Sequence, residues 1–125
     1  MIFRYAIVYV ADVAGTLAFY ERAFGLSRSF LHESGDYGEL GTGETRLAFS
    51  SHALMAQLGK DVATTPGKPA CEIAFETEDV AKALERALAA GATPVQGVET
   101  MPWGQTTAYV KAPEGTLVEI CTKVG

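Results

Sequence analysis

Histidine, cysteine and clustered positive charge are scarce in this 125-residue sequence. It has two His and two Cys, and the cysteines, Cys71 and Cys121, are too far apart to form the Cys-x-x-Cys pair of a structural zinc site. Its 10 basic residues are scattered and are outnumbered by 15 acidic ones, which gives a formal net charge of −5. Such a surface repels phosphates, so we expect no nucleic-acid partner.

Long apolar runs and the motifs of common enzymes are also missing. No run approaches the roughly 20 apolar residues that span a bilayer, and Arg4 interrupts the apolar start where a signal peptide would continue. There is no Gly-x-Ser-x-Gly, no P-loop and no Cys–His pair at a suggestive spacing, and Gly41-Thr42-Gly43 is typical of a hairpin turn. The lack of a membrane span and of a signal-peptide pattern predicts a cytoplasmic protein that does not contact a membrane.

The composition indicates one folded domain over residues 1–125. Hydrophobic residues make up 48% of the chain and charged residues 20%, which suits a packed core rather than disorder. Both cysteines fall in apparent strands of a chain with its own core, so we expect buried free thiols and no disulfide.

One pattern of strand, capped helix and closing glycine occurs twice. Phe3–Val10 is rich in β-branched and aromatic residues and predicts a strand. Asp12 is then a helix N-cap, and Gly25 ends the helix Val13–Phe24. The second copy is made of the strand Glu72–Thr77, the N-cap Asp79, a helical stripe of Val80, Ala83, Leu84, Ala87 and Leu88, and Gly91.

Three further strands follow the helix in each copy. They are Ser27–Glu33, Tyr37–Gly41 and Thr45–Ser50 in the first copy and Thr93–Glu99, Gln105–Lys111 and Thr116–Thr122 in the second. Each copy is therefore β-α-β-β-β, which predicts an α+β protein with modules at about 1–51 and 70–125. The linker, 52–69, begins with a short helix, Ala53–Leu58, and ends as a loop.

The ordered set of these features resembles the vicinal oxygen chelate superfamily, the glyoxalase/bleomycin resistance protein/dioxygenase-like domains. The resemblance is carried by Phe19-Tyr20 and Gly25-Leu26 in the first copy and by the closing segments 102–110 and 113–120, and it covers essentially the whole chain. It implies that two βαβββ modules form an open, cup-shaped mixed β-sheet. It also implies a homodimer in which one chain helps to complete the other's cup.

The resemblance further implies four metal-ligand positions, on the first and last strand of each module. In this sequence they are Tyr5, Ala48, Glu72 and Glu119, and only Glu119 has the usual residue type. A site without imidazole or thiolate is poor for zinc, nickel or iron, although two carboxylates could hold Mg²⁺ or Mn²⁺. We therefore predict no cofactor and keep a divalent metal as an alternative.

Alternation along the strands indicates which side chains line the cup. Ala6, Val8 and Val10 would support the helix, which leaves Tyr5, Ile7 and Tyr9 on the opposite face. Ligand pockets are usually apolar with a few placed polar groups. The expected ligand-binding residues are Tyr5, Ile7, Tyr9, Phe49, Glu72, Trp103, Gln105, Tyr109 and Glu119. Phe49 and Tyr109 could instead be ordinary core residues.

Glu72 and Glu119 would form a pair if both faced one apolar cup. Two such carboxyl groups would share a proton, which suits general acid/base chemistry or a cationic or hydroxyl-rich ligand. We predict a metal-free protein that binds a small aromatic or cationic molecule. The alternatives are a lyase or isomerase that uses Glu119, Glu72 and Tyr5 as catalytic residues, and a divalent-metal-dependent glyoxalase- or dioxygenase-like enzyme.

Overall fold

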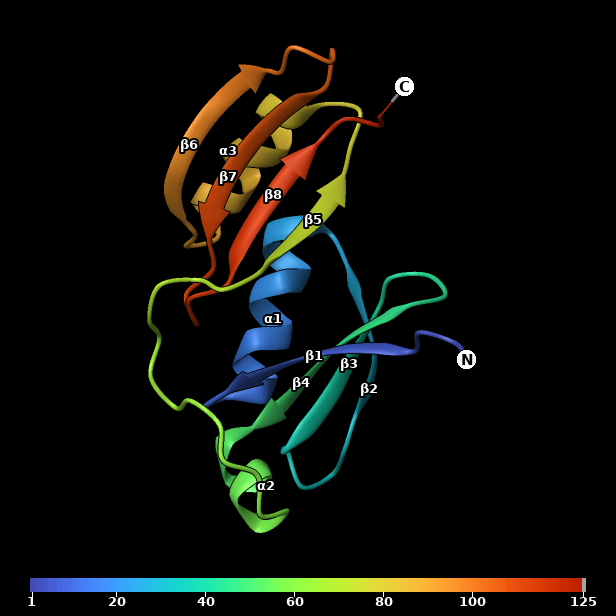
Figure 1. Ribbon diagram of the computed structural model, residues 1–125, viewed down its shortest axis with the longest axis vertical. Helices are drawn as coiled ribbons and strands as arrows, with labels where there is room; N and C mark the ends of the chain where they lie inside the picture. Colours follow the sequence, from blue (N-terminus) through green and yellow to red (C-terminus); the bar gives the residue numbers. More distant parts are fainter. Residues whose placement is uncertain (125) are drawn as a thin grey trace. The chain divides into compact units, whose positions relative to one another are not determined.

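A computed structural model describes residues 1–124, which form two compact units. The first unit consists of Met1–Glu21 and Gly25–Thr65, and the second of Arg22–Phe24 and Pro66–Gly125. Each unit contains one four-stranded sheet and at least part of a long helix (Figure 1). The α+β class predicted from the sequence is confirmed.

The first sheet has the strand order β1-β4-β3-β2. β1 and β4 are parallel, and the other neighbours are antiparallel. The elements of this half of the chain are β1 (Tyr5–Val10), α1 (Val13–Phe24), β2 (Ser27–Leu31), β3 (Tyr37–Gly41), β4 (Arg46–Ser51) and α2 (His52–Gln57).

The second sheet repeats this topology, with the order β5-β8-β7-β6. β5 and β8 are its parallel pair. Its elements are β5 (Glu72–Glu76), α3 (Val80–Ala89), β6 (Thr93–Thr100), β7 (Thr106–Lys111) and β8 (Leu117–Cys121). The identical strand orders confirm that the two copies seen in the sequence are structural repeats.

Both long helices begin at the aspartates that the sequence predicts. The Asp12 carboxylate accepts a hydrogen bond from the Gly15 amide, and that of Asp79 accepts one from the Lys82 amide. These bonds satisfy backbone donors that have no partner within the first helical turn. α1 ends at Gly25, whose φ of 69° is the left-handed conformation that glycine adopts without strain.

The core of the first unit lies between α1 and one face of the sheet. Val13 and Leu17 of α1 are fully buried and pack against the backbone of Gly38 in β3. On the same side, the Tyr20 ring lies 5.1 Å from the ring of Phe49 in β4. Large apolar side chains meeting a glycine allow a helix to approach a sheet closely, which explains why Gly38 sits inside a strand.

Three expectations about burial and boundaries were wrong in detail. Cys71 is exposed, because it precedes β5, whose pairing begins at Glu72; only Cys121 is a buried free thiol. Leu88 of the predicted apolar stripe is 37% exposed, near the end of α3. β1, β2 and β5 are shorter than predicted, because pairing with the neighbouring strand sets their ends.

No helix within residues 1–124 is long and apolar enough to cross a membrane.

Candidate functional site

Each sheet has a face turned away from the helix side, and the predicted site residues on the strands lie mainly there. In the first unit this face, the first open face, carries Tyr5, Ile7, Tyr9, Tyr37, Glu39, Arg46 and Ala48, as register and alternation require. Tyr5, Ile7 and Tyr9 are 44%, 43% and 41% exposed. The predicted alternation along β1 is therefore present, and it leaves an apolar, largely aromatic strip at the sheet edge.

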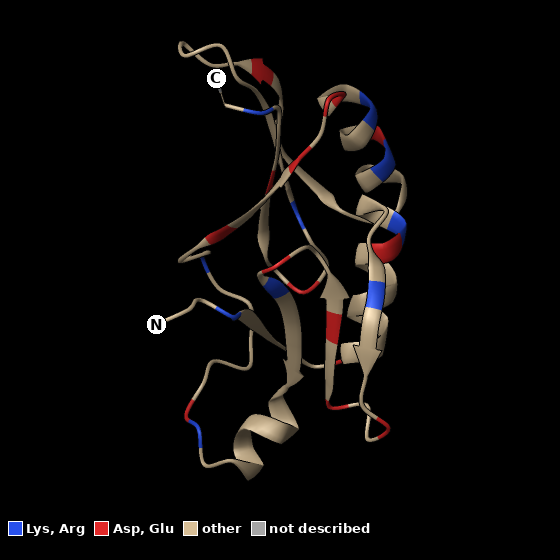
Figure 2. Ribbon diagram, turned by 90° about the vertical axis from the view of Figure 1, so that its right-hand side faces the viewer, with Lys and Arg blue, Asp and Glu red and all other residues tan. Residues whose placement is uncertain are grey.

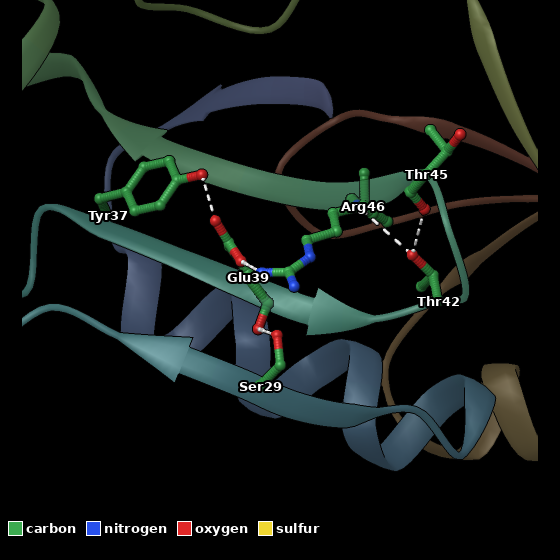
Figure 3. A network of polar contacts seen from close by, with 7 residues as sticks. Ser29, Tyr37, Glu39, Thr42, Thr45 and Arg46 are labelled. Carbon is green, nitrogen blue, oxygen red and sulfur yellow. Dashed lines mark hydrogen bonds and ion pairs between the residues drawn. The ribbon is translucent and has the colours of Figure 1, made fainter. Parts of the chain in front are cut away.

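A buried carboxylate lies at the centre of the first open face. Glu39 of β3 is 6% exposed and pairs across the sheet with Ala48 of β4. Tyr37 donates its hydroxyl hydrogen to Glu39 Oε2 at 2.7 Å, and Arg46 Nη1 donates to Glu39 Oε1 at 2.6 Å. Figure 3 shows Tyr37 and Arg46 approaching the carboxylate from opposite sides. Both oxygens of Glu39 are thus occupied.

Hydrogen bonding decides the ionisation of this cluster. Burial acts to raise the pKa of Glu39, but the hydrogen bonds from Tyr37 and Arg46 and the guanidinium charge outweigh it, so the pKa lies below its ordinary value. Burial and the bond to a carboxylate raise the pKa of Tyr37 well above its usual range. At neutral pH the cluster is therefore a neutral phenol, a carboxylate and a guanidinium.

The second unit also has an open face, on the side of its sheet away from α3. This second open face carries Glu72, Ala74, Glu76, Thr107, Tyr109 and Glu119, as register and alternation require. The exposure of β5 alternates as predicted, with Glu72, Ala74 and Glu76 exposed and the residues between them partly buried. In Figure 2 the ribbon is red at acidic residues and blue at basic ones, and the two colours alternate along the chain without a large patch of either.

Two carboxylates flank one phenol on the second open face. The Tyr109 hydroxyl lies 3.1 Å from Glu72 Oε2 and also hydrogen-bonds Glu119 Oε2. A phenol has one hydrogen, so it cannot donate fully to both acceptors at once. The bond to Glu119, together with burial and the bond to Glu72, raises the pKa of Tyr109 well above its usual range. Tyr109 therefore remains a donor at neutral pH.

The chain belongs to a known superfamily by its sequence. A family model described as the Glyoxalase/Bleomycin resistance protein/Dioxygenase superfamily matches residues 2–120. This protein is a member of that superfamily. The resemblance inferred from the repeated βαβββ pattern is thereby confirmed. Comparison with curated proteins finds no match.

Solved structures of low sequence identity share the fold. A glyoxalase-related enzyme from Fulvimarina pelagi is 23% identical, with a TM-score of 0.82 over 96% of this chain and 86% of that one. TioX from Micromonospora sp. ML1 is 21% identical, with a TM-score of 0.75 over 98% of each chain. Virulence protein STM3117 from Salmonella typhimurium is 24% identical, with a TM-score of 0.72 over 99% and 98%. Their names describe those proteins, and the likeness shows the fold.

The four metal-ligand positions implied by the superfamily do not offer a set of donors that suits zinc, nickel or iron. Ala48 has no donor atom, and Tyr5 offers a phenol. The carboxylates of Glu72 and Glu119 both lie within hydrogen-bonding distance of the Tyr109 hydroxyl, and no imidazole or thiolate stands at any of the four positions. Among residues 1–124 no three His, Cys, Asp or Glu side chains gather as metal ligands would. Absence of a metal stays a prediction.

Three residues predicted to contact a ligand lie elsewhere. Phe49 is fully buried against Tyr20, because it alternates with Ala48 and so faces α1; its assignment to the cup wall was wrong. Trp103, in the turn between β6 and β7, is 65% exposed and donates its Nε1 hydrogen to Gln105 Oε1. Gln105 Nε2 in turn donates to the carbonyl of Thr122, which follows β8, so both ends of the Gln105 amide already have partners within the protein.

Cys121 adds no reactive thiol to the second open face. It is buried, and its Sγ donates weakly to the Phe75 carbonyl at 3.7 Å. Burial and the neighbouring Glu119 carboxylate raise the pKa of the thiol. A protonated, enclosed thiol is a poor nucleophile.

The Glu39–Arg46 ion pair was missed by the sequence reasoning, although a signal for the position of Glu39 was present. Tyr37, Glu39 and Gly41 alternate with Gly38 and Leu40, so a period of two already separates the two faces of β3. The link to Arg46 depends on the register between β3 and β4, which the hairpin 42–45 sets and which local sequence does not specify.

Proposed function

We propose that this superfamily member is a small-molecule-binding protein that holds a small aromatic or cationic ligand without a metal ion. The single observation that carries the proposal is the Glu72–Tyr109–Glu119 cluster. It places two carboxylates beside an aromatic ring on an open sheet face. This combination suits a cationic group attached to an apolar body.

The charge balance of the cluster supports a cationic partner. Within residues 1–124, neither Glu72 nor Glu119 forms an ion pair, whereas Glu21 pairs with Arg28 and Glu39 pairs with Arg46. One phenol hydrogen cannot satisfy two carboxylates, so at least one retains unused acceptor capacity. An organic cation would supply the missing charge, and the Tyr109 ring could add a cation–π contact of about 0.5–1 kcal/mol.

A matched set of variants tests this assignment. Isothermal titration with benzyltrimethylammonium should detect binding, and Glu119→Gln or Glu72→Gln should weaken it by about threefold or more, as expected when one partner of a solvated charge pair is lost. Glu85→Gln removes the same charge from an exposed position on α3 and should have little effect. Equal losses in all three variants would mean that net charge alone attracts the probe, which would refute the proposal.

A second candidate function is acid/base catalysis of a lyase or isomerase type at the same carboxylates. The shared phenol hydrogen favours it, because a proton on one carboxyl group can pass to the other through the Tyr109 hydroxyl. Compounds that raise the melting temperature in a screen with and without chelator should be incubated with the protein and followed by NMR. Conversion that Glu119→Gln abolishes while binding persists supports catalysis, and binding without conversion supports sequestration.

A further inference from the structure

Arg46 presents an unused hydrogen-bonding edge on the first open face. Its side chain is 51% exposed, and Nη1 donates to Glu39, whose side chain is only 8% exposed. Nε and Nη2 donate to no other residue in the described part of the chain, 1–124. The guanidinium is therefore fixed by a buried carboxylate at Nη1, while the N–H groups of its Nε–Nη2 edge can donate hydrogen bonds to a ligand.

The other ion pair of the first unit differs on this point. Arg28 donates both Nε and Nη2 to Glu21 Oε1, at 3.1 and 2.9 Å, so the same edge of its guanidinium is already used. Both partners are partly exposed, with 36% and 33% of their side chains accessible. Arg28 is thus an ordinary surface pair and provides a matched control for Arg46.

The ion pair with Glu39 restricts the Arg46 side chain, and it carries a desolvation cost that an exposed pair does not have. Removing a carboxylate from water is expensive, and here Glu39 has both oxygens bonded to compensate for it. A long arginine side chain normally loses rotamer freedom when it binds a ligand. Because Glu39 already holds Arg46, part of that loss has occurred before any ligand arrives.

On the side toward β1, the neighbours of Arg46 on this face are mainly apolar, and about half of its side chain is exposed. Tyr5 is the register partner of Arg46 across β1 and β4, and Ile7 is the partner of Ala48. Tyr5 and Ile7 are exposed, and Ala48 is too small to cover the guanidinium. A planar edge of two parallel N–H donors matches a carboxylate, and a tyrosine ring beside it suits a flat aromatic body.

We propose that Arg46 binds the carboxylate of a small aromatic acid, whose ring packs against Tyr5 and Ile7 on the first open face. This depends on the proposed function only in that the occupant is a small molecule on an open sheet face. It names a second ligand chemistry, separate from the organic cation assigned to Glu72 and Glu119. The two assignments involve different residues and different probes, so either can fail alone.

Three probes separate charge from ring. Benzoate carries both groups, benzamide has the ring without the charge, and acetate has the charge without the ring. Titrations followed by amide chemical shifts should show benzoate binding about tenfold more tightly than either, because charge-assisted hydrogen bonds add to ring packing. The shifts should centre on β1 and β4. Equal affinities for benzoate and benzamide would overturn the role of Arg46.

Variants then assign the effect to one guanidinium. Arg46→Gln should lower benzoate affinity about tenfold, to the level of benzamide, whereas Arg28→Gln should leave it unchanged. Arg46→Gln leaves Glu39 buried without its cation, so the double variant Arg46→Gln/Glu39→Gln, which keeps the net charge, guards against misfolding. The double variant should show the same loss. Benzoate binding that survives in it, or an equal loss in Arg28→Gln, would refute the proposal.

Discussion

Replacing Tyr37 by Phe removes one hydroxyl from the buried centre of the first open face. In the native protein that hydroxyl donates to Glu39 Oε2 at 2.7 Å, and Glu39 is 6% exposed, so water cannot readily take its place. A hydrogen bond to a charged, buried acceptor contributes about 2 kcal/mol to the free energy of unfolding. We therefore expect Tyr37→Phe to lower the free energy of unfolding at pH 7 by about 2 kcal/mol.

The loss should depend on pH in a defined direction. Because the folded-state pKa of Glu39 lies below its ordinary value of 4.5, its ionised form stabilises the fold at higher pH. That stabilisation is complete above 4.5 and is lost as the pH falls through the lower folded-state value. Removing the phenol raises the folded-state pKa, so the variant has less of this stabilisation to lose. The difference from the native protein should shrink below pH 4.5, toward the roughly 1 kcal/mol of a neutral hydrogen bond.

Urea unfolding followed by far-UV circular dichroism, at a series of pH values from 7 downward, measures this difference. Tyr9→Phe is the matched control, because Tyr9 lies on the same face, is 41% exposed and makes no hydrogen bond through its hydroxyl within residues 1–124. It should change the free energy of unfolding by less than about 0.5 kcal/mol. Equal losses in the two variants, or a loss in Tyr37→Phe that does not change with pH, would contradict the assigned role of Glu39.

Two further predictions concern the fold and the metal. Gly38→Ala should cost about 1–3 kcal/mol, because a Cβ there would lie 2.6 Å from the buried Leu17 Cδ1 and 3.2 Å from the Phe30 carbonyl. Gly41→Ala in the same strand meets only an ordinary 3.5 Å contact and should be nearly neutral in the same urea assay. Elemental analysis of the purified protein should find less than stoichiometric metal, and chelator should leave its melting temperature unchanged; a stoichiometric ion would refute metal-free binding.

Much of the fold could be predicted because its signals are local. Asp12 and Asp79 cap helices by accepting a hydrogen bond from the amide three residues further along the chain. Gly25 ends α1 through its own backbone conformation. The repeat of these signals, followed by three strands, was enough to identify paired βαβββ modules. The open-face positions of Tyr5, Ile7 and Tyr9 followed from a period of two, which is also a local property.

The parts of the site that were missed depend on pairing between strands. Phe49 is an exception, because its alternation with Ala48, which was assigned to the open face, already turns it toward the helix and Tyr20. Glu39 and Arg46 are seven residues apart across a hairpin, and their contact exists only in the register that the structure adopts. Such contacts cannot be read from composition or periodicity, because a shift of one residue would reverse every side chain.

Comparison of equivalent positions in the two repeats explains why their open faces offer different chemistry. In the second unit Tyr109 of β7 pairs with Glu119 of β8, and in the first unit Glu39 of β3 pairs with Ala48 of β4. The carboxylate is thus on the strand next to the metal-ligand position in one repeat and at that position in the other. In the first repeat the carboxylate of Glu39 pairs with Arg46 of the same sheet, and this face presents a guanidinium.

Where the carboxylate is at the ligand position, as Glu119 is, it bonds a phenol and no cation, and a second carboxylate on β5 competes for the same hydrogen. That face keeps unpaired negative charge. A metalloenzyme of this superfamily needs several strong donors at the four positions, and this chain keeps carboxylates at only two of them, both in one repeat. The two proposals thus assign to each repeat a recognition surface for one sign of charge. This division of charge favours ligand binding over metal chemistry more strongly than the loss of any single ligand residue does.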